Sequence, residues 1–402
     1  MTQEEKIYDL SAIWRHAAFV FPHFHRCGVN WDEAYREFLP RALQIRTDRE
    51  HCLLMAEFIN LLGDGHTDVS FNREMTDTIG YLPFALEYQE GEYFADGKQV
   101  LDFNGKPISE ILEDAKRYVY HVGNYVPRLR YILPFLLDSW ENTMETESGR
   151  VHFTLMNERP NLNRESSTRF RTYGDVLCIR FDDLLRPRAG EIREKILEER
   201  PRAVILDIRQ NIGGMTKFGA DIAQLFLDGQ FGGCKKWTRQ MTGVEYASSL
   251  QVLNMSEEQL AAISGKADRE EIEKSRKIAQ LADFEEYEDC WGDAETKAVF
   301  DGRVVLLTSR KTVSAAEDFT AFFRTNKRAT IIGTPTCGTS GTPLLKGLFC
   351  GTLRVCSVGY QLRDGTEFLG KGIQPDLMVD TSVTDSRQGR DTVLEAALEY
   401  LK

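Results

Sequence analysis

The chain of 402 residues lacks the features that would place it in a membrane or on a nucleic acid. No apolar run approaches the ~20 residues that a membrane-spanning helix needs. The first residues lack the basic and apolar segments of a secretion signal, so we expect a cytoplasmic protein. Basic residues are too few to offset the acidic ones, with 50 Lys and Arg against 62 Asp and Glu and a net charge of −12. Nucleic acids and membranes are therefore not expected partners.

Signatures of nucleotide and metal chemistry are also missing. The sequence contains no phosphate-binding P-loop and no G-x-G-x-x-G after a strand, so no nucleotide cofactor is expected. The eight cysteines include no C-x-x-C pair, and several, such as Cys52 and Cys178, lie in apolar runs. Reduced, buried thiols are favoured over disulfides or a zinc site. His23 and His25 could bind a metal, but no further ligand follows at zincin spacing, so we expect ordinary histidines and no metal.

The length and the sequence pattern indicate two or three units. Residues 1–78 form an N-terminal helical module, in which Thr47 and Glu50 have the spacing of a helix start and Gly63 that of a helix end. Residues 79–170 mix short strands with turns and a helix over about 108–122. Residues 171–402 alternate strands and helices, which is typical of an α/β core.

The α/β core carries apolar runs of the kind buried in parallel sheets. Strands are expected over 176–181, 202–208, 303–308, 329–333 and 353–360. Helices are expected over about 216–227 and from Ser314 onward. Between them, 254–298 is charged and acidic, which predicts a solvated helical insertion.

Two loops of this core could carry chemistry. In the loop 207–214, the adjacent Gly213 and Gly214 allow a sharp turn that exposes N–H groups, which suits the binding of an oxyanion. In the loop 312–317, Ser314 falls where a helix begins. Taken alone, the glycine pair indicates a tight connection and the serine an N-cap. The G-x-S-x-G elbow of α/β-hydrolases is absent.

The order of four segments changes this interpretation. The loop 64–67, the loops 207–214 and 312–317, and the stretch 370–376 resemble, in this order, the tail-specific (C-terminal-processing) serine protease family. The resemblance implies a crotonase/ClpP-like core of strand–strand–helix units. It also implies a serine peptidase that hydrolyses peptides or unfolded protein segments. By the same resemblance, Ser314 is the nucleophile, and the N–H groups of Gly213, Gly214 and Ala315 form the oxyanion hole.

The general base departs from the commonest pattern of that family. Many members use a lysine, but Thr339 stands at the matching position, and a neutral threonine cannot take the serine proton. Lys346 and Lys371 lie nearby in sequence without matching the motif. The chain therefore resembles the tricorn-core-like branch, whose base is a histidine from an upstream loop. His66 fits that place, although Gly65 stands where that branch has a serine.

The group that orients the imidazole is expected after the catalytic helix. The resemblance favours Glu367, with Asp364 as the alternative. Glu317, one helical turn beyond Ser314, is expected to support the site.

The middle module has only a fragment of a PDZ signature, at 102–108, without a carboxylate-binding loop, so a degenerate or replaced PDZ-like module is expected. The competing functions are a non-catalytic small-ligand or peptide-binding protein on the same scaffold and an interaction scaffold that uses the acidic insertion.

Overall fold

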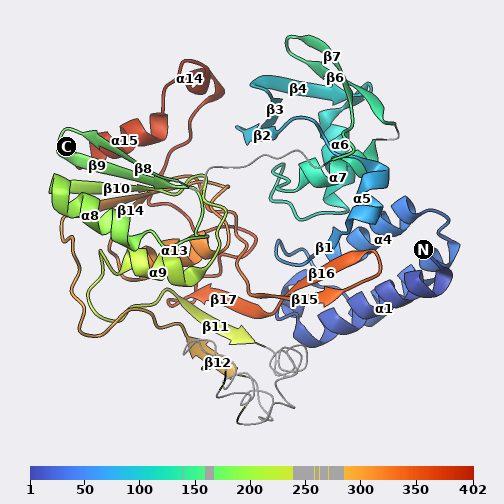
Figure 1. Cartoon of the computed structure of the whole chain (residues 1–402), viewed down its shortest axis with the longest axis horizontal. Helices are drawn as coiled ribbons and strands as arrows, with labels where there is room; N and C mark the ends of the chain where they lie inside the picture. The colour runs from blue at the N-terminus through green and yellow to red at the C-terminus, as the bar shows by residue number, and fades with distance from the viewer. Residues whose placement is uncertain (138, 159–166, 239–257, 259–261, 263–269, 271–284) are drawn as a thin grey trace.

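The computed structural model describes the chain except for residue 138 and the ranges 159–166, 239–257, 259–261, 263–269 and 271–284, drawn as a grey trace in Figure 1. Most of the predicted insertion 254–298 therefore lies outside the described residues. Its described end contains a strand, β12 (Glu285–Glu288), where a helix was predicted. No described helix is both long and apolar enough to cross a membrane.

The N-terminal part is helical, as predicted. Thr47 and Glu50 form a capping box that starts the helix preceding the His66 loop. That helix ends at Asn60, and Gly63 follows with a positive φ of 59°. Its buried face includes Cys52, as the apolar run predicted. The helices are α1 (Gln3–Val20), α2 (Phe24–Cys27), α3 (Trp31–Gln44), α4 (Asp48–Asn60) and α5 (Arg73–Ile79).

A hairpin from the C-terminal half completes this N-terminal core. Strand β1 (Asp68–Phe71) pairs antiparallel with β16 (Gly351–Cys356), which pairs in turn with β15 (Pro343–Gly347). Figure 1 shows the orange hairpin beside the blue N-terminal helices. The apolar side chains of β16 belong to the same buried cluster as those of α1 and α4. The segment that precedes β1 is thereby fixed from both halves of the chain.

The middle module is built on one antiparallel sheet with the order β2-β3-β4-β6-β7. The predicted helix over 108–122 is shorter, and an unpredicted helix with an internal proline, Pro134, follows it. The strands are β2 (Leu86–Gln89), β3 (Glu92–Ala95), β4 (Lys98–Phe103), β5 (Lys106–Pro107), β6 (Glu141–Thr146) and β7 (Gly149–Thr154). The helices are α6 (Ile108–Lys116) and α7 (Leu129–Leu136).

The α/β core is organised around a six-stranded sheet with the order β18-β14-β13-β10-β9-β8. All neighbours are parallel except β8 and β9. Strand β10 is buried along its whole length, as its continuous apolar run predicted. The strands are β8 (Thr168–Tyr173), β9 (Val176–Phe181), β10 (Ala203–Asp207), β13 (Arg303–Thr308), β14 (Thr330–Gly333) and β18 (Leu377–Met378).

Helices cover both faces of this sheet, which makes the fold mixed α/β. Alternate side chains of the strands pack on α8, α9 and α13 on one face and on α15 on the other. In Figure 1 the α/β core lies opposite the middle module and the N-terminal helices. The helices are α8 (Ala189–Glu199), α9 (Thr216–Ala223), α13 (Ala315–Thr325), α14 (Val383–Arg387) and α15 (Thr392–Leu401).

A third sheet, β12-β11-β17, connects the six-stranded sheet of the α/β core to the hairpin. It contains β11 (Cys234–Thr238) and β17 (Val358–Leu362). The predicted single strand over 353–360 is therefore wrong, because the chain leaves β16 at Ser357 and enters β17 in a different sheet. Because of this change of sheet, the hairpin packs on the N-terminal core while β17 remains with the α/β core.

Candidate active site

Ser314 and His66, 248 positions apart in sequence, meet in the structure. The Nε2 atom of His66 lies 2.9 Å from Ser314 Oγ. That distance lies within hydrogen-bond reach of a general base for a nucleophile. The two residues come from the loop between α4 and β1 and from the loop between β13 and α13.

Ser314 has a strained backbone at the point where α13 starts. Its φ of 59° and ψ of −127° belong to a conformation that residues with a side chain rarely adopt. The backbone N–H of Ser314 donates to the carbonyl of Thr339 at 3.1 Å, and Cys337 N–H donates to the carbonyl of Thr312 at 3.0 Å. These bonds hold the turn, and its shape places the hydroxyl ahead of the helix rather than in an N-cap bond.

The His66 loop is held in place by hydrogen bonds that do not involve the imidazole. The Asp64 carboxylate accepts from the backbone N–H of His66 at 3.1 Å and from the Thr67 hydroxyl at 2.6 Å. The Thr67 hydroxyl in turn accepts from the N–H of Cys356 on β16 at 3.0 Å. The C-terminal hairpin therefore positions the loop that carries the base.

The second imidazole nitrogen contacts a threonine instead of a carboxylate. Nδ1 of His66 lies 2.7 Å from Thr339 Oγ1. When Nε2 accepts from Ser314, Nδ1 carries the proton and donates a hydrogen bond to the threonine oxygen. This approach depends on Gly65, because a Cβ there would lie 2.6 Å from Thr339 Oγ1.

Glu367 does not reach the imidazole, so its predicted role is wrong for this geometry. Its side chain is 48% exposed and lies 4.0 Å from Arg26 Nε. The alternative, Asp364, is exposed and accepts from the N–H of Thr366 in its own turn. Both residues follow β17, which runs in a different sheet from the hairpin that holds the His66 loop.

Glu317 supports the loop that carries Thr339. Its fully buried carboxylate accepts from the Thr336 hydroxyl at 2.6 Å and from the N–H groups of Gly338 and Thr339 at 2.7 and 2.8 Å. Burial raises the pKa of Glu317 to about 8, although these hydrogen bonds act in the opposite direction. Glu317 thus acts on the imidazole through Thr339.

Two backbone donors remain available beside Ser314. Within the described part of the chain, the N–H groups of Gly214 and Ala315 have no hydrogen-bond partner. The N–H of Gly213, by contrast, donates to the Asn211 side chain at 2.9 Å, so its predicted role as an oxyanion donor is wrong. Its contribution is steric, because a Cβ on Gly213 would lie 2.6 Å from the carbonyl oxygen of Val313.

The electrostatic surroundings keep the base neutral. Burial lowers the pKa of His66 to about 4, and the positive charge of Arg354 acts in the same direction. A neutral imidazole at physiological pH can accept the serine proton.

These groups open into a cavity of about 550 Å³. His66, Ser314, Gly214 and Ala315 all line it. Ile212, half exposed beside the glycine turn, adds an apolar wall. The volume lies within the range of about 300–1,000 Å³ that is usual for ligand-binding pockets.

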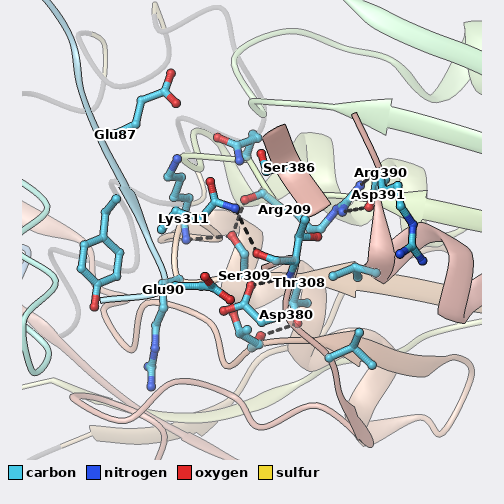
Figure 2. A pocket seen from close by; sticks show the side chains of 18 of the residues that line it. Glu87, Glu90, Arg209, Thr308, Ser309, Lys311, Asp380, Ser386, Arg390 and Asp391 are labelled. Carbon is cyan, nitrogen blue, oxygen red and sulfur yellow. Dashed lines mark hydrogen bonds and ion pairs between the residues drawn. The ribbon is translucent and has the colours of Figure 1, made fainter. Parts of the chain in front are cut away.

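A second cavity, of about 370 Å³, borders the nucleophile loop at 308–311 (Figure 2). Its central cation, Arg209, is paired with the carboxylates of both Asp207 and Asp391. Arg390 on its rim is paired with Asp385 and Glu395. These wall charges are satisfied within the protein, so we assign no ligand to it.

One buried group of metal-ligand residues lies away from the site. Asp9, His51 and Cys350 have ligand atoms within 4.8 Å of one another. The Asp9 carboxylate, however, already accepts from the N–H groups of Phe349 and Cys350 and contacts His51 Nε2 at 3.1 Å. These contacts give the group a structural role.

His23, one of the two histidines considered for metal binding, does not line this cavity. His23 is buried, with its ring edge-on to Phe21 and Trp237. The side chain of His25 lies outside the description.

The sequence of the α/β core matches the family described as Peptidase family S41 over residues 178–379, which is half of the chain. The chain belongs to this family. Among curated relatives, it is 21% identical to a carboxy-terminal-processing protease of Bartonella bacilliformis over 237 residues, 57% of this chain and 44% of the relative. The chain spans less than half the length of the curated relatives that it matches.

Solved structures show the same fold over nearly the whole chain. The structure of mature CPAF complexed with lactacystin is 14% identical, with a TM-score of 0.71, and the match covers 99% of this chain and 97% of that one. The photosystem II D1 C-terminal processing protease is also 14% identical, with a TM-score of 0.53, and the match covers 94% and 95% of the two chains. At these identities the likeness concerns the fold alone.

Proposed function

We propose that this S41 family member is a serine peptidase that hydrolyses peptides or unfolded protein segments. The observation that carries the proposal is the 2.9 Å contact between His66 Nε2 and Ser314 Oγ in the wall of a cavity. Membership of the family, with a carboxy-terminal-processing protease among the relatives, supports the same activity.

The reaction follows from the positions of the groups. The Ser314 hydroxyl attacks the scissile carbonyl while His66 Nε2 takes its proton. The N–H groups of Gly214 and Ala315 receive the developing oxyanion. The imidazolium then gives its proton to the leaving amine, and water hydrolyses the acyl-enzyme by the reverse proton transfer.

The third member of this arrangement is neutral. Thr339 Oγ1 accepts from Nδ1 and fixes the ring, but it brings no negative charge to stabilise the imidazolium. Glu317 would supply such a charge only in its ionised form, and then only through the Thr339 loop. We infer that orientation is the main contribution of Thr339.

Two finer statements belong to the same proposal. The parallel order β9-β10-β13-β14 with helices on both faces supports a crotonase/ClpP-like core. The eight cysteines, all in the free form, support a cytoplasmic location.

The competing proposal is a carrier or binding protein on the same scaffold. A carrier has no physical need for a strained serine that is hydrogen-bonded to a neutral imidazole. The geometry therefore favours the enzyme.

Hydrolysis of an unfolded protein such as casein tests the proposal. Ser314→Ala is expected to lower the rate by about 10³-fold or more, because the nucleophile is removed. Ser70→Ala, an exposed serine on β1, is the matched control and should keep full activity. Undiminished casein hydrolysis by Ser314→Ala would refute the assignment of the nucleophile.

A further inference from the structure

Two arginines line the same cavity as Ser314 and His66. Arg128 precedes α7 in the middle module, and Arg354 lies on β16 in the hairpin. They come from different parts of the fold and converge on one carboxylate, that of Asp68 on β1.

The three side chains do not balance in charge. Arg354 Nε lies 3.0 Å from one oxygen of Asp68, while its Nη2 binds the other oxygen. Arg128 Nη1 lies 2.6 Å from that second oxygen. Two guanidinium groups thus share one carboxylate, which leaves one net positive charge at the wall of the cavity. The contrast is Arg209 in the second cavity, where one cation has two carboxylates.

Donors of both arginines remain available. Within the described part of the chain, Arg354 Nη1 and the Nε and Nη2 atoms of Arg128 donate to no acceptor, and the two side chains are 27% and 31% exposed. Two guanidinium edges with free N–H groups are suited to a carboxylate, which accepts from both.

The lining of the cavity also includes a carboxylate. Asp318 lines it from α13, and its carboxylate accepts from the hydroxyls of Thr216 and Ser340 at 2.6 and 2.9 Å. A negatively charged ligand group would therefore be directed away from Asp318 and toward the arginines.

The arginines lie on the side of the base. The charge of Arg354 acts on the imidazole of His66, and Arg354 and Asp68 are direct cross-strand partners one strand away from the His66 loop. The leaving amine must receive its proton from His66, so the leaving segment of the substrate lies on this side.

We propose that Arg128 and Arg354 bind a carboxylate carried by the leaving segment of the substrate, within the first few residues after the cleaved bond. The inference rests on the proposed peptidase function and narrows its substrate class. An acidic side chain and the terminal carboxylate of a short leaving segment offer the same chemistry.

The alternative is that the three residues only join the parts of the fold. A purely structural role predicts that losing either arginine impairs all substrates equally. A role in recognition predicts that the loss falls on carboxylate-bearing substrates, so the ratio between matched substrates separates the two.

The test uses three internally quenched peptides built on one bond that the enzyme cleaves in casein. The first has Glu directly after the bond and an amidated end, the second has Gln and a free carboxylate three residues further on, and the third has Gln and an amidated end. We compare kcat/KM for the wild type, Arg128→Met, Arg354→Met and the control Arg202→Met. Arg202 pairs with Asp175 and does not line the cavity.

The wild type should cleave at least one carboxylate peptide about ten-fold faster than the neutral one, the scale of a charge-assisted contact. The preference should fall toward one in Arg128→Met and Arg354→Met and persist in Arg202→Met. Comparison of the first and second peptides identifies the source of the carboxylate.

No preference in the wild type, or the same preference in both variants, would overturn the inference while leaving the peptidase intact. If no peptide is cleaved, fluorescence anisotropy of the same labelled peptides on Ser314→Ala protein measures the preference as a ratio of Kd values. Equal Kd values there would also overturn the inference. A carboxylate preference in binding without hydrolysis would support it and refute the peptidase function instead.

Discussion

Thr339 occupies the position at which a serine triad usually has an acid. Its hydroxyl holds the ring of His66 without adding charge. Replacing the aspartate of a serine triad lowers kcat by about 10⁴-fold. Loss of a neutral orienting group should lower kcat less, by about 10- to 100-fold.

Thr339→Val therefore should lower kcat in that range with little change in KM, because Val keeps the shape but cannot accept from Nδ1. Thr339→Ser keeps the oxygen and should retain most of the activity. Glu367→Gln should be silent, since that carboxylate lies against Arg26. Steady-state kinetics on one peptide checks all three, and a loss in Glu367→Gln with none in Thr339→Val would restore the original assignment.

The pH profile depends on the burial of His66. Because burial lowers its pKa to about 4, the imidazole stays neutral as the pH falls from about 7 toward 5, and base activity is lost only as the pH passes through the folded pKa. The acid limb of kcat/KM should accordingly lie well below the ordinary histidine value of about 6.5. A limb at or above that value would show that His66 is less buried during turnover than in this structure.

At the level of single residues, the sequence predicted the groups that stand in recognisable motifs. Ser314 and His66 each lie at a junction between regular elements, so their motifs also fix their positions. In the sequence, Thr339 stands out only because it occupies the position of the missing lysine. The useful signal was that a residue at the lysine position must face the nucleophile, where a short hydroxyl can serve the imidazole.

Glu367 was misplaced for a related reason. Sequence order cannot show which sheet a following strand joins, and the turn after β17 lies away from His66. The role of Gly213 was likewise decided by a local contact, its bond to Asn211.

At the scale of elements, the close approach of two loops is the decisive feature. The His66 loop and the Thr339 loop touch at Gly65, where a side chain would meet Thr339. Gly65→Ala should therefore displace the Thr339 hydroxyl and lower kcat by about 10-fold or more.

Gly190→Ala in α8 is the matched control, because a Cβ there meets nothing within 4 Å. It should leave kcat unchanged and raise stability slightly, by about 0.4–1 kcal/mol. Kinetics and thermal melting of the pair distinguish the local clash from a general effect of replacing glycine. Equal activities for the two variants would contradict the proposed packing.

Elements with strong periodicity were predictable, and elements defined by their partners were not. The buried strands β10 and β13 appear where continuous apolar runs placed them. Helix α7 was not predicted because it contains Pro134, a residue that usually interrupts helices. The strand over 353–360 is divided by a change of sheet, which only tertiary packing decides.

At the scale of the whole molecule, the site depends on a contact between helix α1 and the turn between β15 and β16, here called the joint. Asp9 on α1 accepts from two N–H groups of the β15–β16 turn and contacts His51 on α4. The joint holds the hairpin against the helices that precede the His66 loop. No motif announces this contact, because its partners are separated by some 340 residues.

Asp9→Ala leaves those buried donors without an acceptor, so the free energy of unfolding should fall by about 2–4 kcal/mol. Asp77→Ala, at an exposed position of α5, is the control and should change it by less than about 0.5 kcal/mol. Urea denaturation of both variants measures the difference. Equal stabilities would show that the joint contributes little to the fold.

The proposed hydrolysis requires that Ser314 is a nucleophile activated by His66. Labelling of the intact protein with a fluorophosphonate, followed by peptide mass mapping, tests it most directly. We expect one adduct, on Ser314, that is strongly reduced in His66→Ala and absent in Ser314→Ala. An unlabelled protein, or an adduct on another serine with Ser314 unmodified, would contradict it.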